Sequence, residues 1–494
     1  MSPFASVYVI VGGFISAFHL FSLLFRNHLL LNEVLLGTVF GIFVGPQGLG
    51  VFDPRSWAGS RFNDVTHEIM RIVLAADLFA IGVELPGSYM AQHARGLLIM
   101  VVPTMAVGWM IVGFCIRLLL PQLDWPSCLT IAACLTPTDP VICSSIVGGK
   151  FATENVPRRI RHILSAESAA NDGLAFPFLT ISMSLVLGEL PRKAFIHWLW
   201  MGWLYQVALG TLAGSLIGYL FSSFMRRSLA LGFIDRESYV AQCFALALFT
   251  VGSITIIGSD DLLAVFAAGS AISWDQDFNK KIENTLFSSV LQQMLNCACF
   301  IYLGATLSLD IVWRPSLGVT PWTLVTLGAA ILILRRIPAI LFLYRWVPEI
   351  SGWKEALFTG HFGPVSQVHM MGVGAVFMAT MALEQLPHPH DPPEGQQEIL
   401  ADVLRSVIAF VVLASIVIHG LSISFFTLYK KVQFGGIESS SPFERLDSEW
   451  LRWLQHHRPQ LNDNIRAPGP VSSQRVQEQI NTVSGHRPSA SDVD

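Results

Sequence analysis

The chain has 494 residues, of which 52% are hydrophobic and 13% are charged, and its mean hydropathy is +0.53. This composition excludes an ordinary soluble domain, in which about 25% of residues are charged. The formal net charge of -4 argues against a nucleic-acid partner. The sequence is therefore that of an integral membrane protein.

Apolar runs of about 20 residues, long enough to cross a hydrocarbon core of about 30 Å as a helix, recur along the chain. They predict an all-α polytopic membrane protein with about 13 transmembrane helices. The predicted helices are 7–25, 29–50, 69–90, 97–121, 126–149, 162–188, 198–222, 237–257, 262–274, 285–309, 321–345, 356–384 and 402–430.

Basic residues gather in alternate predicted loops. Because lysine and arginine are retained on the cytoplasmic side, we expect the amino terminus outside and the carboxyl terminus in the cytoplasm. The bases that set this orientation are Arg158, Arg159, Arg161, Arg226, Arg227, Arg236, Lys280, Lys281, Lys430 and Lys431.

The chain turns polar after the last predicted helix. Trp450, Trp453 and Leu454 fall roughly on one helical face, which is typical of a segment lying on a membrane surface. The residues beyond it have too few apolar side chains to bury a core. We predict a transmembrane domain (1–437), an amphipathic interfacial segment (438–460) and a disordered cytoplasmic tail (461–494).

Ionisable side chains inside a membrane helix cost about 2.5 to 3.5 kcal/mol on insertion scales, so they normally face a cavity or a charged partner. Each such residue is a candidate for function. In the predicted helices they are Asp77, Glu84, Asp139, Glu167, Asp172, Arg335, Arg336, His361 and His369.

The stretch "LTPTDPVICSS" places Pro137 and Pro140 around Thr138 and Asp139. Each proline removes a backbone donor and clashes with the preceding turn, so the helix should break here. In secondary transporters, the carbonyls freed at such a break are cation ligands when they line a cavity. We therefore predict a cation site at this break.

The stretch "SAESAANDGLAF" supplies more oxygens, because Ser168 and Asp172 are four residues apart on one helix, as are Glu167 and Asn171. Such a set suits Na⁺, Li⁺ or K⁺, and no histidine or cysteine set offers an equally good transition-metal site. Desolvation favours the protonated carboxyl and a bound cation favours the charged one, so protons and metal ions exclude each other. The predicted cation- and proton-binding residues are Asp172, Asp139, Asn171, Thr138 and Ser168.

Glu167 has two open interpretations, as an ion ligand or as the structural partner of an intramembrane arginine. Arg335 and Arg336 need a carboxylate, because a buried unpaired charge is very costly. Asp260 and Asp261 also have two open interpretations: they are part of a solvated loop, or they form an external pair that gathers cations.

A second break is predicted at Pro364 in "GHFGPVSQVHMMGVGAVF". Two interrupted helices at corresponding positions of two halves indicate an inverted-repeat transporter. The first six and the last six predicted helices would be those halves, with 126–149 and 356–384 as counterparts.

The motifs together resemble those of the fungal plasma-membrane alkali-metal cation/proton antiporters, within the monovalent cation/proton antiporter superfamily. They cover nearly the whole membrane region. The matching stretches are "FAIGVELP" (79–86), "TPTDPV" (136–141), "GKFATENVPRRIRHILSAESAANDGLAFPF" (149–178), "DDLL" (260–263), "RRIP" (335–338), "HFGP" (361–364) and "GVGAVF" (372–377).

The resemblance implies a sodium/proton antiporter-like fold of thirteen helices, with a dimerisation domain, a core domain and two broken helices that cross. It implies that Asp172 is the main ion and proton carboxylate, with Asn171 beside it. Glu167 would pair with an arginine of "RRIP", with Arg336 favoured over Arg335. Thr138, Asp139 and Ser168 would contribute further oxygens.

We expect a secondary antiporter, not an enzyme, that exchanges cytoplasmic Na⁺, and also Li⁺ or K⁺, for external H⁺ by alternating access. We expect the protein to be a homodimer in the plasma membrane and to have no resident cofactor. Its activity would give the cell salt tolerance. A K⁺-preferring antiporter is the alternative. Two other classes are disfavoured: an intramembrane aspartyl protease with Asp139 and Asp172 as its dyad lacks the usual GxGD signature, and a cation channel lacks a repeated filter sequence.

Overall fold

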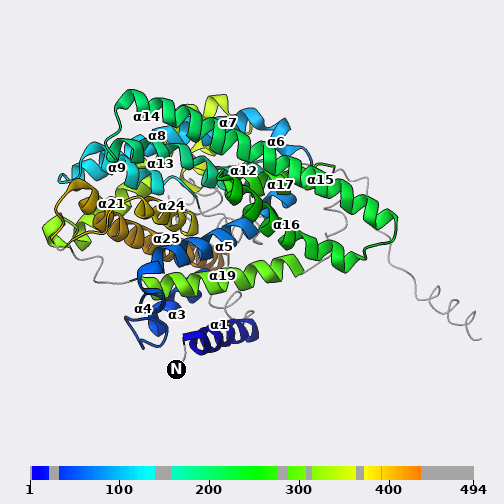
Figure 1. The fold of residues 1–494 in the computed structure, drawn as a ribbon, viewed down its shortest axis with the longest axis horizontal. Coiled ribbons are helices and arrows are strands. Elements are labelled where there is room, and N and C mark those ends of the chain that lie inside the picture. Colours follow the sequence, from blue (N-terminus) through cyan, green and yellow to red (C-terminus); the bar gives the residue numbers. More distant parts are fainter. Residues whose placement is uncertain are drawn as a thin grey trace, which may run out of the picture. The chain divides into compact units, whose positions relative to one another are not determined.

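The computed structural model describes residues 3–21, 33–138, 157–275, 287–307, 314–362, 372–390 and 392–434. Within these ranges every regular element is a helix, and the one β-type pairing is an isolated bridge between Arg314 and Val319. The predicted all-α class is confirmed for the described part of the chain (Figure 1). The predicted interfacial segment and tail lie outside it.

The helices follow the apolar runs of the sequence. In chain order the principal ones are α1 (Pro3–Leu20), α3 (Glu33–Val44), α5 (Phe62–Glu84), α7 (Ala94–Val101), α8 (Pro103–Leu119), α9 (Trp125–Cys134), α12 (Arg158–Leu174), α13 (Phe176–Val186), α14 (Pro191–His197), a π-helical segment (Trp198–Leu209), α15 (Gly210–Ala230), α16 (Arg236–Ile257), α17 (Asp261–Ile272), α19 (Phe287–Thr306), α21 (Pro321–Leu334), α22 (Ile337–Leu343), α23 (Trp353–Phe362), α24 (Val373–Glu384) and α25 (Gln396–Phe434). Two short helices, α4 (Pro54–Ala58) and α6 (Tyr89–Gln92), lie before α5 and α7.

Every predicted span overlaps one of these helices, but several spans are subdivided. The predicted helix 97–121 consists of α7 and α8, because Pro103 begins a new helix. Five described segments are long and apolar enough to cross a membrane: Ala94–Leu119, Arg158–Val186, Pro191–Ala230, Pro321–Trp346 and Gln396–Ile418. The total of thirteen spans stays a prediction.

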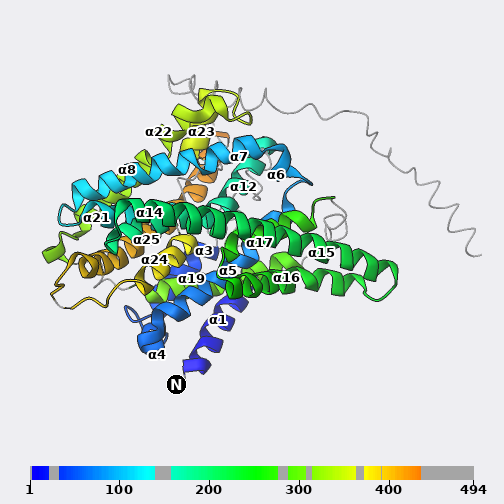
Figure 2. The ribbon, with the colours of Figure 1, turned by 45° about the horizontal axis from the view of Figure 1, so that its top comes forward.

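The segment Pro191–Ala230 is longer than its predicted span and runs through α14, the π-helical segment and α15 without interruption (Figures 1 and 2). Its wider π-helical turns lie beside the turn between α16 and α17. Ser259 donates a hydrogen bond from Oγ to the carbonyl of Tyr205 (2.7 Å), and Gln206 donates from Nε2 to the carbonyl of Gly258 (3.1 Å). The π-helical segment therefore holds the turn that begins α17.

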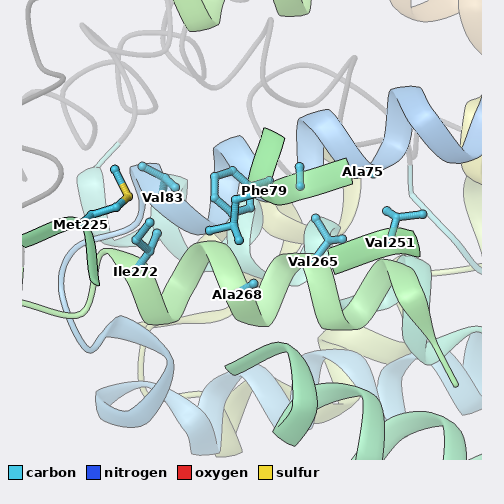
Figure 3. Packing of buried hydrophobic residues seen from close by; sticks show 10 residues of the cluster. Ala75, Phe79, Val83, Met225, Val251, Val265, Ala268 and Ile272 are labelled. Atoms are coloured by element: carbon cyan, nitrogen blue, oxygen red, sulfur yellow. The ribbon is translucent and has the colours of Figure 1, made fainter. Parts of the chain in front are cut away.

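A cluster of buried apolar residues joins four of these helices. Phe79 and Val83 of α5 face Val265 and Ile272 of α17, with Met225 of α15 at one end (Figure 3). Lipid tails are as apolar as these side chains, so close packing rather than escape from water holds such helices together. The remaining members are Ala75, Leu246, Ala247, Val251 and Ala268.

Small residues bring α15 and α17 unusually close. A methyl group added at Gly214 would lie 2.1 Å from the carbonyl oxygen of Ala264, and one at Gly218 would lie 2.3 Å from that of Ala268. With Gly210 these residues repeat every four positions, the small-residue pattern of tightly packed membrane helices. The pattern leaves no room for a side chain on this face.

Replacing Gly214 by valine should lower the thermal stability of the solubilised protein, because overpacking costs about 1–3 kcal/mol. Thermal unfolding followed by size-exclusion chromatography measures this. Gly252→Val on α16 is the matched control, because a methyl group at Gly252 meets nothing within 4 Å. Equal unfolding temperatures for the two variants would contradict the packing argument.

Candidate functional site

The site begins where α9 ends. Asp124 starts this helix, its carboxylate accepting a hydrogen bond from the backbone N–H of Ser127 (2.9 Å). The helix stops at Cys134, three residues before Pro137, which has no N–H to continue it. Within the described residues, the helix predicted over 126–149 therefore ends at Cys134, and Thr138 lies just beyond that end. Asp139 lies outside the described residues.

Thr138 is bound to α12 on both its backbone and its side chain. Its N–H donates to Oδ1 of Asn171 (3.1 Å), whose Nδ2 donates back to the Thr138 hydroxyl (2.7 Å). That hydroxyl donates to Ser168 Oγ (3.1 Å), and Ser168 Oγ donates to the Thr138 carbonyl (3.5 Å). The three residues form a closed ring of hydrogen bonds in which the Thr138 N–H and both hydroxyls donate to acceptors within the ring. The structure thus brings together the predicted residues Thr138, Ser168 and Asn171.

Asp172 follows Asn171 and points to another side of α12, since consecutive helical residues are about 100° apart. Its side chain is 1% exposed. A methyl group added at Gly374, near the start of α24, would lie 3.0 Å from both Asp172 Oδ1 and Pro137 Cβ. Asp172 therefore lies where α12, the end of α9 and the start of α24 meet.

Glu167 lies one turn before Asn171 and contacts Arg336. The distance from Arg336 Nη2 to Glu167 Oε2 is 2.5 Å, and both residues are buried. This places the carboxylate beside the arginine that the motif resemblance favoured.

Arg335 has different partners from Arg336. Its Nη2 donates to the carbonyl oxygens of Thr136 and Pro137, the latter at 3.4 Å. We predicted that carbonyls freed by the break would serve as cation ligands. In the described part of the chain, Arg335 binds the carbonyls of Thr136 and Pro137. A buried carbonyl without a donor is costly, and a guanidinium offers five N–H groups.

A small pocket lies on the Asn171 side of α12. Its lining includes Thr138, Glu167, Asn171, Arg335 and Arg336, together with Met100 and Thr104. The hydrogen-bonded ring and the ion pair therefore line the same pocket.

Asp260 and Asp261 are not in a solvated loop, so that interpretation was wrong: they are 1% and 6% exposed. Asp260 caps α17 by accepting a hydrogen bond from the N–H of Leu263 (2.9 Å). Asp261 Oδ2 lies 3.0 Å from Arg71 Nε and accepts a hydrogen bond from Thr255 (2.9 Å). The π-helical segment lies against Gly258 and Ser259, and the two carboxylates that follow face α5, α12 and α16.

Asp260 also packs against the predicted site, which the sequence alone did not indicate. A methyl group at Gly173 would lie 2.7 Å from Asp260 Oδ2. Asp77 is likewise buried and accepts a hydrogen bond from Gln292 on α19. Helix α23 ends at Phe362 and α24 begins at Val373, whereas the predicted break at Pro364 and His369 lie outside the described residues.

These features define a polytopic helical membrane protein with a buried polar site between the end of α9 and the carboxylate-bearing helix α12. A sequence profile of the transmembrane sodium/hydrogen exchangers matches residues 14–429. The chain belongs to this sodium/hydrogen exchanger family, which confirms the resemblance seen in the motifs.

Several fungal proteins of this family are similar over most of the chain. A probable Na⁺/H⁺ antiporter of Schizosaccharomyces pombe is 41% identical over 86% of this chain and 56% of its own length. A Na⁺/H⁺ antiporter of Saccharomyces cerevisiae is 38% identical over 85% of this chain and 43% of its own length. The chain thus spans about half the length of these two relatives. A second Schizosaccharomyces pombe Na⁺/H⁺ antiporter is 36% identical, over 86% of this chain and 90% of its own length.

The fold is similar to that of the sodium proton antiporter MjNhaP1 from Methanocaldococcus jannaschii. The structure at pH 8 aligns with a TM-score of 0.61 at 16% identity, over 86% of this chain and 99% of that one. The predicted sodium/proton antiporter-like fold is therefore confirmed.

Proposed function

We propose that this protein exchanges cytoplasmic Na⁺ for external H⁺ by alternating access, with Asp172 binding either a cation or a proton. The observation that carries the proposal is the position of Asp172 at the meeting of α12, the α9 break and α24. The relatives' printed activities support the choice of ions.

Charge balance explains why one carboxylate can couple the two ions. In a site closed to water, a charged Asp172 requires a bound cation, and a protonated one has no charge to hold it. Asp139 is proposed as a second carboxylate, and Ser168, Thr138 and Asn171 as neutral groups that position the ion and supply oxygens. Glu167 and Arg336 would hold α12 against the interruption between α21 and α22.

Li⁺ and K⁺ are proposed as further substrates, and a K⁺-preferring exchange is the second candidate. We further propose a homodimer in the plasma membrane, with the amino terminus outside and no resident cofactor. The basic residues that follow the predicted helices 126–149 and 198–222 support this orientation.

Reconstituted vesicles test the proposed activity directly. A vesicle with an inwardly directed Na⁺ gradient should alkalinise inside as Na⁺ enters and H⁺ leaves, followed with a trapped pH dye. Parallel gradients of Li⁺, K⁺ and choline rank the substrates. Faster proton movement with K⁺ than with Na⁺ would favour the second candidate, and no proton movement with any alkali cation would refute the exchange. Clamping the membrane potential then shows whether exchange moves net charge.

A further inference from the structure

Arg335 and Arg336 lie at an interruption between two helices and bind different elements. Helix α21 ends at Leu334 and α22 begins at Ile337, so the two arginines occupy the turn between them. Arg336 reaches Glu167 on α12, whereas Arg335 reaches the carbonyls of Thr136 and Pro137 beyond α9. The turn therefore joins the two elements that carry the predicted cation-binding residues.

The segment 136–138 is held from opposite sides. The N–H and hydroxyl of Thr138 are fixed by Asn171 and Ser168 on α12. The carbonyls that precede Thr138 are fixed by the Arg335 guanidinium, which is 7% exposed. Thr136 is still tied to α9, because its N–H and its hydroxyl donate to the carbonyl of Ala133 (3.1 and 2.7 Å). Pro137 has no N–H to extend this bonding, so the contacts with Arg335 and α12 help to fix the backbone at Pro137 and Thr138.

The backbone of Arg335 is itself fixed by α8. A methyl group added at Gly108 would lie 2.7 Å from the Arg335 carbonyl oxygen, so the two backbones are in direct contact. The guanidinium thus extends from a rigid support. A planar guanidinium on a fixed backbone can hold adjacent carbonyls in one geometry, which the single ammonium of lysine does less well.

We propose that Arg335 is a positioning residue of the transport site: by holding the carbonyls of Thr136 and Pro137 it fixes Thr138 relative to Asn171 and Asp172, and so sets the apparent cation affinity. The proposal rests on the proposed Na⁺/H⁺ exchange. It assigns Arg335 a role distinct from that of Arg336, whose partner is a carboxylate.

The opposing interpretation is electrostatic. A fixed positive charge near a cation site repels the cation, so removing that charge should tighten binding. Positioning predicts the reverse, because without the guanidinium the segment 136–138 is less well ordered. The signs of the two effects therefore differ in a variant that lacks the charge.

Two variants separate these effects in the full-length protein reconstituted in vesicles. Arg335→Lys keeps the charge and loses the planar fork, and Arg335→Gln loses both. We expect each to raise the KM for Na⁺ about fivefold or more while kcat stays within about twofold, since Asp172 is unchanged. The Na⁺ concentration that gives half of the Na⁺-induced thermal stabilisation in detergent should rise by a similar factor.

Arg345→Lys, at an exposed position just after α22, makes the same chemical change away from the site; it is the matched control and should leave KM unchanged. Gly108→Ala is a third test variant, because its methyl group must displace the Arg335 backbone while the guanidinium remains. It should also raise KM, and it decides the question if the Arg335 variants fail to fold.

An unchanged KM in the folded Arg335 variants, or in Gly108→Ala if those do not fold, would overturn the positioning role. A lower KM in Arg335→Gln would overturn it in favour of repulsion. Wild-type vesicles without Na⁺ exchange would instead overturn the proposed function, and this role with it.

Discussion

Replacing Asp172 by asparagine should reduce Na⁺/H⁺ exchange at least about 100-fold in reconstituted vesicles, because an amide neither binds a proton in this pH range nor supplies charge to balance a cation. Asparagine has nearly the same shape, so the meeting point of α12, Pro137 and Gly374 should keep its packing. The loss should appear in kcat and be the same at every external pH, which distinguishes it from a shifted pH optimum.

The control for this variant is the same aspartate-to-asparagine change at Asp124, which lies at the start of α9, away from the site. Asp124 caps that helix through a hydrogen bond from the N–H of Ser127, and asparagine caps helices about as well as aspartate. Asp124→Asn should therefore keep wild-type exchange and a wild-type elution profile. Substantial exchange by a correctly folded Asp172→Asn protein would remove Asp172 from the mechanism and turn attention to Asp260, which packs beside Gly173.

Much of this site follows from local chemistry that a sequence displays. Pro137 predicts that α9 must stop, and the helix does end at Cys134. The four-residue spacing of Ser168 and Asp172, and of Glu167 and Asn171, predicts which residues share a face of α12. These predictions needed only the geometry of one helix and one proline.

Contacts between distant elements could not be predicted in this way. The sequence offered one carboxylate, Glu167, to two adjacent arginines, and the choice depends on how the turn after α21 faces α9 and α12. Asp260 and Asp261 look like loop residues, because "GSDDLL" follows an apolar run, but Asp260 packs beside Gly173 of α12 and Asp261 pairs with Arg71 of α5, and both are buried. Neither the choice of arginine nor the burial of the two aspartates could be inferred from residues at a fixed spacing along one helix.

Removing either partner of the Glu167 and Arg336 pair should destabilise the protein strongly. Both side chains are buried, and an uncompensated buried charge costs about 3–5 kcal/mol. We expect Glu167→Gln and Arg336→Gln each to lower the thermal unfolding temperature in detergent and the yield of folded protein. The matched control is Glu68→Gln, since the Glu68 side chain is 57% exposed beside Arg71, and an exposed pair contributes at most about 1 kcal/mol.

The double variant identifies what the pair does. If Glu167 and Arg336 act on each other, removing both leaves no unpaired charge, so the double variant should unfold at a higher temperature than the sum of the two single effects predicts. Restored folding with substantial Na⁺ exchange per folded molecule would assign Glu167 a structural role. Restored folding without exchange would favour the other interpretation, in which Glu167 contributes to ion binding. Strictly additive losses would contradict the coupling, because a contact of 2.5 Å between opposite charges cannot be thermodynamically independent.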